Sequence, residues 1–323
     1  MSRVEVKRHE IRLGLGMDRT SIDWQGYIPA ITTPFRDDGT FDVPAFRTLL
    51  EWLHGERMHG LVVAGTTGEW FSMSRSERAE QMKVAGDVLG GKTTLLAGCN
   101  AYTASEAIEL AGIAQDAGFN GILLTPPPYV VPTADEVFAY YKTVSDAISL
   151  PICVYNWPRG TGIDMPVELL LRLASLEKVV AVKNSTGDMG HFLSVFFALR
   201  EQIRVFGFTM DELGLSLVRN EGGDGTMGAG AVLGSDHPDF YNAIWRGDLD
   251  AARRHGSRDR VVMSGWFNSD YSARFGSPQS VFKAALNMQG LPGGKVRPPL
   301  LDLSPEDQEN IRSTLKALGR TLV

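Results

Sequence analysis

Residues 151–185 have the sequence PICVYNWPRGTGIDMPVELLLRLASLEKVVAVKNS, and they indicate the fold most directly. Two apolar runs, PICVYN from Pro151 and VVAVKNS from Val179, flank an amphipathic segment that begins at Pro166. This order predicts a strand, a helix with proline in its first turn, and a second strand parallel to the first. Because both runs are almost continuously apolar, we expect helices to cover both faces of the sheet.

The same alternation extends along most of the chain and predicts eight strands. They are YIPAITTPF from Tyr27, GLVVAG from Gly60, TLLAGC from Thr94, GILLTPP from Gly121, PICVYN from Pro151, VVAVKNS from Val179, IRVFGF from Ile203 and GTMGAG from Gly225. Helices are predicted between them, for instance over residues 43–59, 75–89, 104–117, 134–148 and 166–174. Eight such units predict an α/β fold, a closed (β/α)8 TIM barrel.

The pattern also divides the chain into three parts. Residues 1–24 mix charges of both signs and are expected to form an N-terminal extension outside the barrel, with partial disorder left open. Residues 25–234 are predicted to form the catalytic barrel. After Gly234 the strand pattern stops, and helical segments near residues 239–246, 277–289 and 305–318 predict a C-terminal helical extension over residues 235–323.

Composition argues against several classes of function. The chain has 323 residues, of which 43% are hydrophobic, and its net charge of -6 leaves no surplus of cations for nucleic-acid phosphates. No run approaches the roughly 18 apolar residues of a membrane helix. Cys99 and Cys153 lie in apolar, strand-like runs, which predicts buried thiols and a cytoplasmic location. We therefore expect neither a nucleic acid nor a membrane as partner.

Known metal and cofactor signatures are also missing from the sequence. The six histidines are scattered without the spacing of a zinc site, and no GxGxxG motif follows the first predicted strand. The sequence therefore predicts no metal and no bound cofactor.

Reactive side chains gather where the predicted strands end. Thr66 and Thr67 follow the second strand, Tyr129 lies in the loop after the fourth, Tyr155 closes the fifth, and Lys183 closes the sixth. In such barrels the carboxyl ends of the strands meet at the catalytic mouth. A lysine at the end of so apolar a run should be desolvated, which lowers its pKa and frees its lone pair to attack a ketone. The alternative is a lysine that merely reaches solvent or a carboxylate.

Three motifs carry a resemblance to a known family. GTTGE at residues 65–69, YNWPRGTG at 155–162 and AVKNSTGD at 181–188 resemble the dihydrodipicolinate synthase and N-acetylneuraminate lyase family of class I pyruvate-dependent aldolases and dehydratases. The resemblance runs from about residue 26 to residue 318. It implies that Lys183 forms a Schiff base with a 2-oxo acid such as pyruvate, and that Tyr155 gives and takes the protons.

The resemblance also implies roles for the other strand-end residues. Thr66 and Thr67 match the positions that bind the carboxylate of the 2-oxo acid, although these threonines could also serve only to cap the turn. Thr66 and Tyr129 match the positions of a proton relay from Tyr155 to a tyrosine of the neighbouring subunit, which implies a homotetramer built as a dimer of dimers. The register of the Tyr129 loop and the role of Glu69 stay open.

One departure from the family pattern bears on the substrate. Synthases of the family carry an arginine where this chain has Gly160, and Arg159 lies one place earlier. Because an arginine clamp on a carboxylate tolerates little displacement, this weakens the synthase interpretation. Trp70 and Phe71 after GTTGE add bulk and resemble the sugar-acid dehydratase branch.

The glycine-rich loop that contains Met227 and Gly228 is expected to line the far side of the pocket and to suit a longer, polyhydroxylated acid. We therefore predict a lyase that cleaves or dehydrates a 2-keto-3-deoxy sugar acid or a related 4-hydroxy-2-oxo acid. One alternative is a 4-hydroxy-tetrahydrodipicolinate synthase that condenses pyruvate with aspartate semialdehyde. An alternative of another class is a non-catalytic barrel that only binds a 2-oxo acid.

Overall fold

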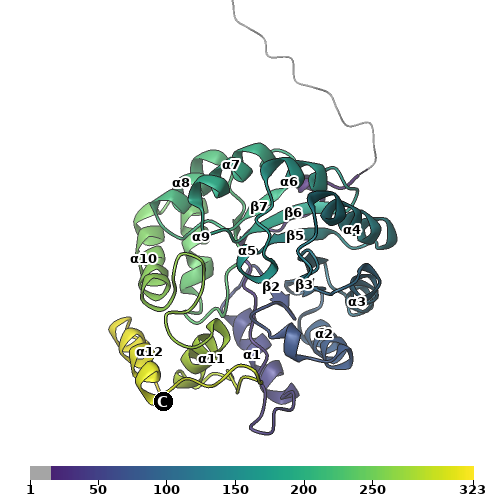
Figure 1. Cartoon of the computed structure of the whole chain (residues 1–323). Coiled ribbons are helices and arrows are strands. Elements are labelled where there is room, and N and C mark those ends of the chain that lie inside the picture. Colours follow the sequence, from purple (N-terminus) through teal and green to yellow (C-terminus); the bar gives the residue numbers. More distant parts are fainter. Residues whose placement is uncertain (1–15) are drawn as a thin grey trace, which may run out of the picture.

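The computed structural model of the chain describes residues 16–323, and its centre is a closed barrel of parallel strands (Figure 1). The strands are β1 Gly26–Tyr27, β2 Gly60–Val63, β3 Thr94–Gly98, β4 Gly121–Leu124, β5 Ile152–Asn156, β6 Val179–Asn184, β7 Arg204–Phe206 and β8 Gly225–Thr226. Their order around the sheet is β1-β8-β7-β6-β5-β4-β3-β2. Parallel bridges from Ala30 to Val62 and to Ala229 close the circle. The predicted eight-stranded TIM barrel is confirmed.

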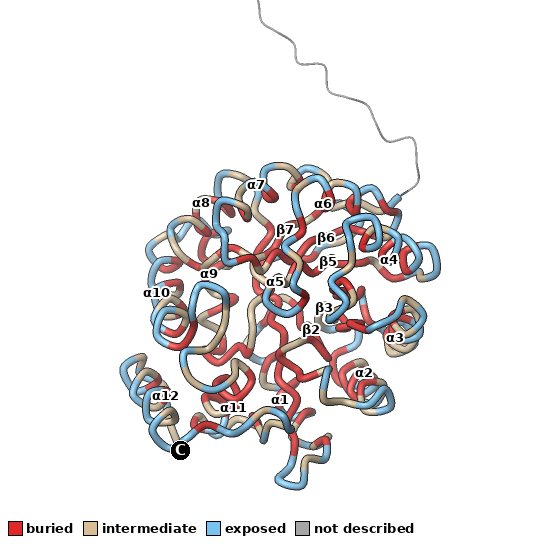
Figure 2. The backbone as a smooth tube through the Cα atoms, in the orientation of Figure 1, coloured by how far each residue is buried: buried red, intermediate tan, exposed pale blue. Residues whose placement is uncertain are grey.

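Helices surround this barrel. They are α1 Val43–Gly55, α2 Arg75–Leu89, α3 Ala104–Asp116, α4 Ala134–Ala147, α5 Pro158–Thr161, α6 Val167–Ala174, α7 Met189–Leu199, α8 Glu212–Glu221, α9 Asp236–Arg246, α10 Leu249–Trp266, α11 Pro278–Met288 and α12 Pro305–Ala317. Short 3-10 turns lie at Arg19–Ser21 and Trp70–Ser72. Ser74 caps α2 as expected, since its side chain accepts a hydrogen bond from the backbone of Glu77. Burial is greatest in the strands and on the helix faces turned toward them (Figure 2).

The C-terminal extension contains one helix more than the sequence predicts. Helix α10 was missed because its buried face is made largely of small or polar residues, namely Ala251, Ala252, Gly256 and Asp259. A Cβ at Gly256 would lie 2.3 Å from the carbonyl oxygen of Met210, so the helix packs very close to its neighbour. A close-packed face of alanine and glycine carries little hydrophobic periodicity, which is the signal on which the prediction rested.

Residues 16–24 lie against the amino-terminal end of the barrel. The backbone of Met17 donates to Glu177, and Arg19 pairs with the buried carboxylate of Asp224 at 3.0 Å. Trp24 is 2% exposed and packs into the barrel interior, where a Cβ on Gly121 would be 2.5 Å from its ring. The predicted N-terminal extension comprises residues 1–24. Of these, residues 1–15 lie outside the described part of the chain.

Replacement of Trp24 tests its packing at the amino-terminal end of the barrel. Trp24→Ala should lower the free energy of unfolding by about 3–5 kcal/mol, because it removes a large buried ring and leaves a cavity. Trp245→Ala is the matched control, since Trp245 is 43% exposed on α9. Urea unfolding followed by circular dichroism measures both, and equal losses in the two variants would contradict the assigned packing of Trp24.

Candidate functional site

Lys183 and Tyr155 lie side by side at the mouth of the barrel. Strands β5 and β6 pair in parallel with Tyr155 opposite Lys183 and Asn156 opposite Asn184. The Nζ atom of Lys183 is 4.3 Å from the centre of the Tyr155 ring. Lys183 is 6% exposed and Tyr155 is 4% exposed, so the amine and the phenol are both largely removed from bulk water.

Neighbouring amides fix the ends of these two strands. Asn156 donates to Asn184 at 2.9 Å and to the carboxylate of Asp164 at 2.6 Å. Thr186 donates to the other oxygen of Asp164 at 2.9 Å. Both asparagines are fully buried, and this network joins the residue after Tyr155 to the residue after Lys183. The relative position of the phenol and the amine is therefore set by side chains that lie directly behind them.

Burial shifts the titration of both groups in useful directions. Desolvation lowers the pKa of Lys183 to about 8, a shift that Cys153 opposes only weakly. An amine with this pKa is neutral in a substantial fraction of molecules near pH 8, as a nucleophile must be. Burial raises the pKa of Tyr155 well above that of a free phenol, while hydrogen bonds with Ser185 and Thr66 lower it in part. Tyr155 therefore holds its proton until a partner accepts it.

The GTTGE loop is held from two sides. On one side Thr33 donates to the carbonyl of Gly68 at 2.7 Å, and Gln81 in turn donates to Thr33. On the other side Gln279 of α11 donates to the carbonyl of Thr66 at 3.0 Å. Thr66 and Thr67 of this loop both line the cavity.

Glu69, whose role the sequence left open, forms a buried ion pair with Lys283 of α11. Both side chains are at most 2% exposed, and neither lines the cavity that contains Lys183. The other carboxylate oxygen of Glu69 accepts a hydrogen bond from the backbone of Arg297 at 3.0 Å. Glu69 also has a left-handed backbone, with φ of 59°. The pair thus fastens a strained residue of the loop to the C-terminal extension.

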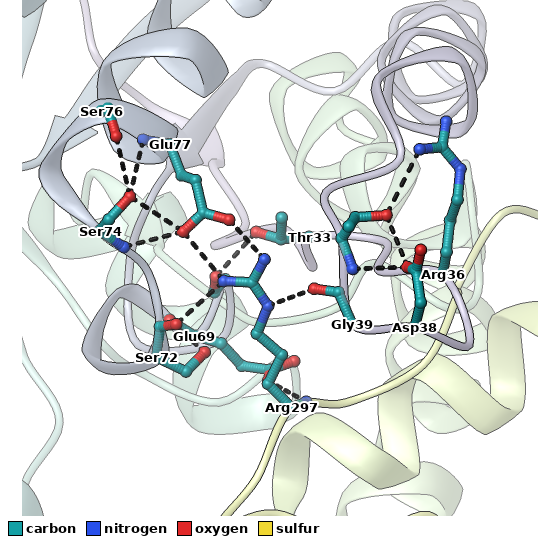
Figure 3. A network of polar contacts seen from close by, with 12 residues as sticks. Thr33, Arg36, Asp38, Gly39, Glu69, Ser72, Ser74, Ser76, Glu77 and Arg297 are labelled. Atoms are coloured by element: carbon teal, nitrogen blue, oxygen red, sulfur yellow. Dashed lines mark hydrogen bonds and ion pairs between the residues drawn. The ribbon is translucent and has the colours of Figure 1, made fainter.

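Arg297 continues this network to helix α2. Its guanidinium bonds the carboxylate of Glu77 and the backbone carbonyls of Ser72 and Gly39, and Figure 3 shows these contacts converging on one side chain. The guanidinium lowers the pKa of Glu77 to about 2. The sequence pattern does not predict this network, because Arg297 lies 220 residues from Glu77 along the chain.

One cavity collects most of the predicted site residues. Thr66, Thr67, Tyr155, Arg159, Lys183, Met227 and Gly228 all line it, and it contains about 1100 Å³ of empty space, part of it open to solvent. Gly160 and Tyr129 do not line it. Tyr129 is 90% exposed, and within a single chain it does not join the site.

Trp157 explains why position 160 holds glycine. The Trp157 ring stacks on Tyr155 with 5.8 Å between ring centres, and a Cβ at Gly160 would lie 2.2 Å from that indole. An arginine at 160 could enter only if the indole moved. Arg159 lies 3.9 Å from Asp270 and is 42% exposed at the cavity rim.

Sequence reasoning also missed residues that come from outside the three motifs. Tyr271 lines the cavity and lies 6.3 Å from Trp157, measured between ring centres. It belongs to the loop between α10 and α11, and its φ of 63° is unusual for a tyrosine. Ser185 was visible in AVKNSTGD, but only the structure shows its hydroxyl beside Tyr155.

Within residues 16–323, no three His, Cys, Asp or Glu side chains come together in a way that could hold a metal ion. None of the helices in that range is both long and apolar enough to cross a lipid bilayer.

Comparison with known proteins gives a consistent result. The model of the family described as "Dihydrodipicolinate synthetase family" matches residues 23–318. A 4-hydroxy-tetrahydrodipicolinate synthase of Acidothermus cellulolyticus is 33% identical, with 91% of this chain and 92% of that protein aligned. An uncharacterized DapA-like lyase of Rhizobium meliloti is 32% identical, with 92% and 96% aligned. A dihydrodipicolinate synthase of Acinetobacter baumannii, solved with pyruvate, superimposes with a TM-score of 0.81 at 28% identity, covering 92% of this chain and 99% of that one.

A double-mutant cycle tests the buried ion pair. Lys283→Met alone should lower the free energy of unfolding by about 3–5 kcal/mol, because it leaves the Glu69 carboxylate buried without its cation. Glu69→Gln combined with Lys283→Met should lose clearly less than the sum of the single losses. The exposed pair Glu212 and Arg253 serves as control. Glu212→Gln and Arg253→Met should show only a small coupling energy. Additive losses at Glu69 and Lys283 in urea unfolding would contradict the pairing.

Proposed function

Because the chain belongs to the dihydrodipicolinate synthetase family, whose members are pyruvate-dependent lyases and synthases, we propose that it binds a 2-oxo acid as a Schiff base on Lys183. The observation that carries this proposal is the position of the Lys183 amine. It is nearly sealed from water, has a pKa of about 8, and faces a phenol on the neighbouring strand. A lysine that served only to cap a strand would not need this environment.

The proposed reaction begins when the neutral amine attacks C2 of the keto acid. Tyr155 protonates the alkoxide that forms at C2 and takes a proton from the new ammonium nitrogen, which gives the carbinolamine. It then protonates the carbinolamine hydroxyl, so that water leaves and the iminium ion forms beside the Tyr155 phenolate. Thr66 and Thr67 hold the substrate carboxylate through hydroxyl and amide hydrogens. The hydrogen bonds of Tyr155 with Ser185 and Thr66 give its proton a path away from the ring.

The iminium ion then draws electrons from the bond beside it. When a base removes the proton of a C4 hydroxyl, the C3–C4 bond breaks, an aldehyde leaves, and an enamine remains on Lys183. Protonation of C3 and hydrolysis release pyruvate and restore the amine. Dehydration begins instead with loss of a C3 proton and departure of the C4 hydroxyl as water. We assign the chain to this lyase chemistry on a 4-hydroxy-2-oxo acid, the group that includes 2-keto-3-deoxy sugar acids.

The synthase reaction with aspartate semialdehyde is less well supported. The family's arginine clamp for the second carboxylate is replaced by Gly160, and Trp157 occupies the adjoining space. Arg159 is held near Asp270 at the rim. A side-by-side assay of 2-keto-3-deoxy acids, 4-hydroxy-2-oxoglutarate, and pyruvate with aspartate semialdehyde decides between the reactions. A covalent adduct without any turnover would favour a barrel that only binds the keto acid.

Trapping of the Schiff base tests the role of Lys183. Borohydride with pyruvate should add one reduced pyruvyl group, located on Lys183 by peptide mass spectrometry. The rate of adduct formation should rise about tenfold per pH unit below pH 8 and level off above it, because only the neutral amine reacts and its fraction grows up to the pKa. Lys183→Ala should give no adduct, whereas Lys178→Ala should react like wild type. An adduct that survives Lys183→Ala would refute the assignment.

We also propose that the enzyme is a cytoplasmic homotetramer in which Tyr129 completes the proton relay of a neighbouring subunit. Support comes from the loop after β4, where Tyr129, Val130 and Val131 are 90%, 67% and 54% exposed. Three such residues in a row would be covered in an assembly. The two buried, unpaired cysteines favour a reducing compartment.

Light scattering should give four times the 35.3 kDa mass of one chain. Tyr129→Phe should keep this mass but lower kcat, because it removes only the phenol hydroxyl that would pass protons. Tyr102→Phe, at a tyrosine that is 63% exposed, is the matched control and should leave kcat unchanged. A monomer with full activity would contradict the shared site.

A further inference from the structure

The cavity that contains Lys183 does not end at the mouth of the barrel. Its wall continues into the C-terminal helices, where residues of α9, α10 and α11 line the same space as Lys183. We call this part the rear chamber and define it by the side chains of Met210, Val232, Val262, Met263, Phe267 and Phe282. The helical extension thus forms a wall of the pocket as well as packing on the barrel.

The walls of the rear chamber are apolar. Phe267 and Phe282 pack with 5.2 Å between ring centres, and Val262 on α10 is only 2% exposed. A hydroxylated chain in this space would give up its hydrogen bonds to water and find few partners. An alkyl or aryl group would instead gain by leaving water.

Several polar side chains elsewhere on the cavity wall are already engaged. The Thr226 hydroxyl donates to the carbonyl of Phe208 at 2.6 Å and accepts from Tyr241. Thr209 donates to Asp211, and the amide nitrogen of Gln279 donates to Thr66. These groups therefore have little capacity left for the hydroxyls of a sugar chain, which runs against the polyhydroxylated acid suggested by the glycine-rich loop.

One polar pair lies beside the rear chamber. His237 of α9 is 3% exposed, and its ring stacks on Tyr27 with 4.3 Å between ring centres. Its Nε2 atom lies 3.3 Å from a carboxylate oxygen of Asp259 on α10, so the two polar side chains pair with each other. The Nδ1 atom of His237 is buried.

We propose that the rear chamber is the subsite for the substrate's C4 substituent, and that this substituent is an apolar chain or ring. The inference rests on the proposed Schiff-base function and specifies its substrate class. It follows from two features together: the continuity of the cavity with Lys183 and the apolar side chains of the chamber.

A series of matched substrates tests the apolar character. Three 4-hydroxy-2-oxo acids are compared, with methyl, phenyl or 1,2-dihydroxyethyl at C4. The phenyl substrate should be cleaved with kcat/KM at least tenfold above the dihydroxyethyl substrate. Equal rates, or preference for the dihydroxyethyl substrate, would overturn the proposal.

Filling the chamber tests its location. Val262→Phe should lower the ratio of kcat/KM for the phenyl substrate to that for the methyl substrate by at least tenfold. Val261→Phe is the control, because Val261 precedes Val262 on α10 but is 45% exposed, and its ratio should match wild type. Thermal unfolding checks that both variants are folded. If Val262→Phe does not fold, Val262→Leu should shift the ratio in the same direction, and an unchanged ratio in a folded variant would overturn the proposal.

The same proteins are also treated with borohydride and pyruvate, which tests the Schiff base separately from the subsite. Absence of a pyruvate adduct in wild type would refute the proposed function itself. An adduct in wild type without the predicted order of substrates would refute only the rear chamber as a subsite.

Discussion

Removal of one amine from water is the constraint on which the proposed chemistry depends. Lys183 is buried because β5 and β6 end inside a closed circle of strands, and that circle closes through the bridges of Ala30 to Val62 and Ala229. In water the pKa of a lysine is near 10.4, and the amine would be almost wholly protonated at neutral pH. The closure of the sheet is therefore linked directly to the reactivity of the lysine.

The C-terminal helices supply what the barrel alone does not. Helix α11 holds the GTTGE loop through Gln279 and Lys283, and so fixes the backbone of Thr66 and the strained conformation of Glu69. A buried ion pair contributes little net stability compared with an apolar pair of similar size. We interpret the pair as a positional device, because a left-handed glutamate persists only where its surroundings determine its conformation.

Much of the fold could be predicted from the sequence, because the strands have a clear residue pattern. Runs such as VVAVKN and GILL are apolar and β-branched in the way that sheets covered on both faces require. Helix α10 did not follow, since its contacts run through alanine and glycine faces. Lys183, Tyr155 and Thr66 could be placed because they close strands or turns. The partners of Glu69 could not, because Lys283 and Arg297 lie in the distant C-terminal extension. The pair His237 and Asp259 could not either, because it joins α9 to α10, the helix that the pattern did not predict.

Trp157 and the rear chamber together determine the direction in which a substrate bound to Lys183 can extend. In the proposed complex, C2 is bonded to Lys183 and the carboxylate lies at Thr66 and Thr67, so the rest of the substrate must extend into free space. The path toward position 160 is occupied by the Trp157 indole, which stacks on Tyr155 and leaves no room for a side chain at Gly160. The space behind β8 remains, between Gly228 and helices α9 to α11. Under the proposed function, the indole on one side and the apolar chamber on the other both favour a keto acid whose far end needs no oppositely charged side chain.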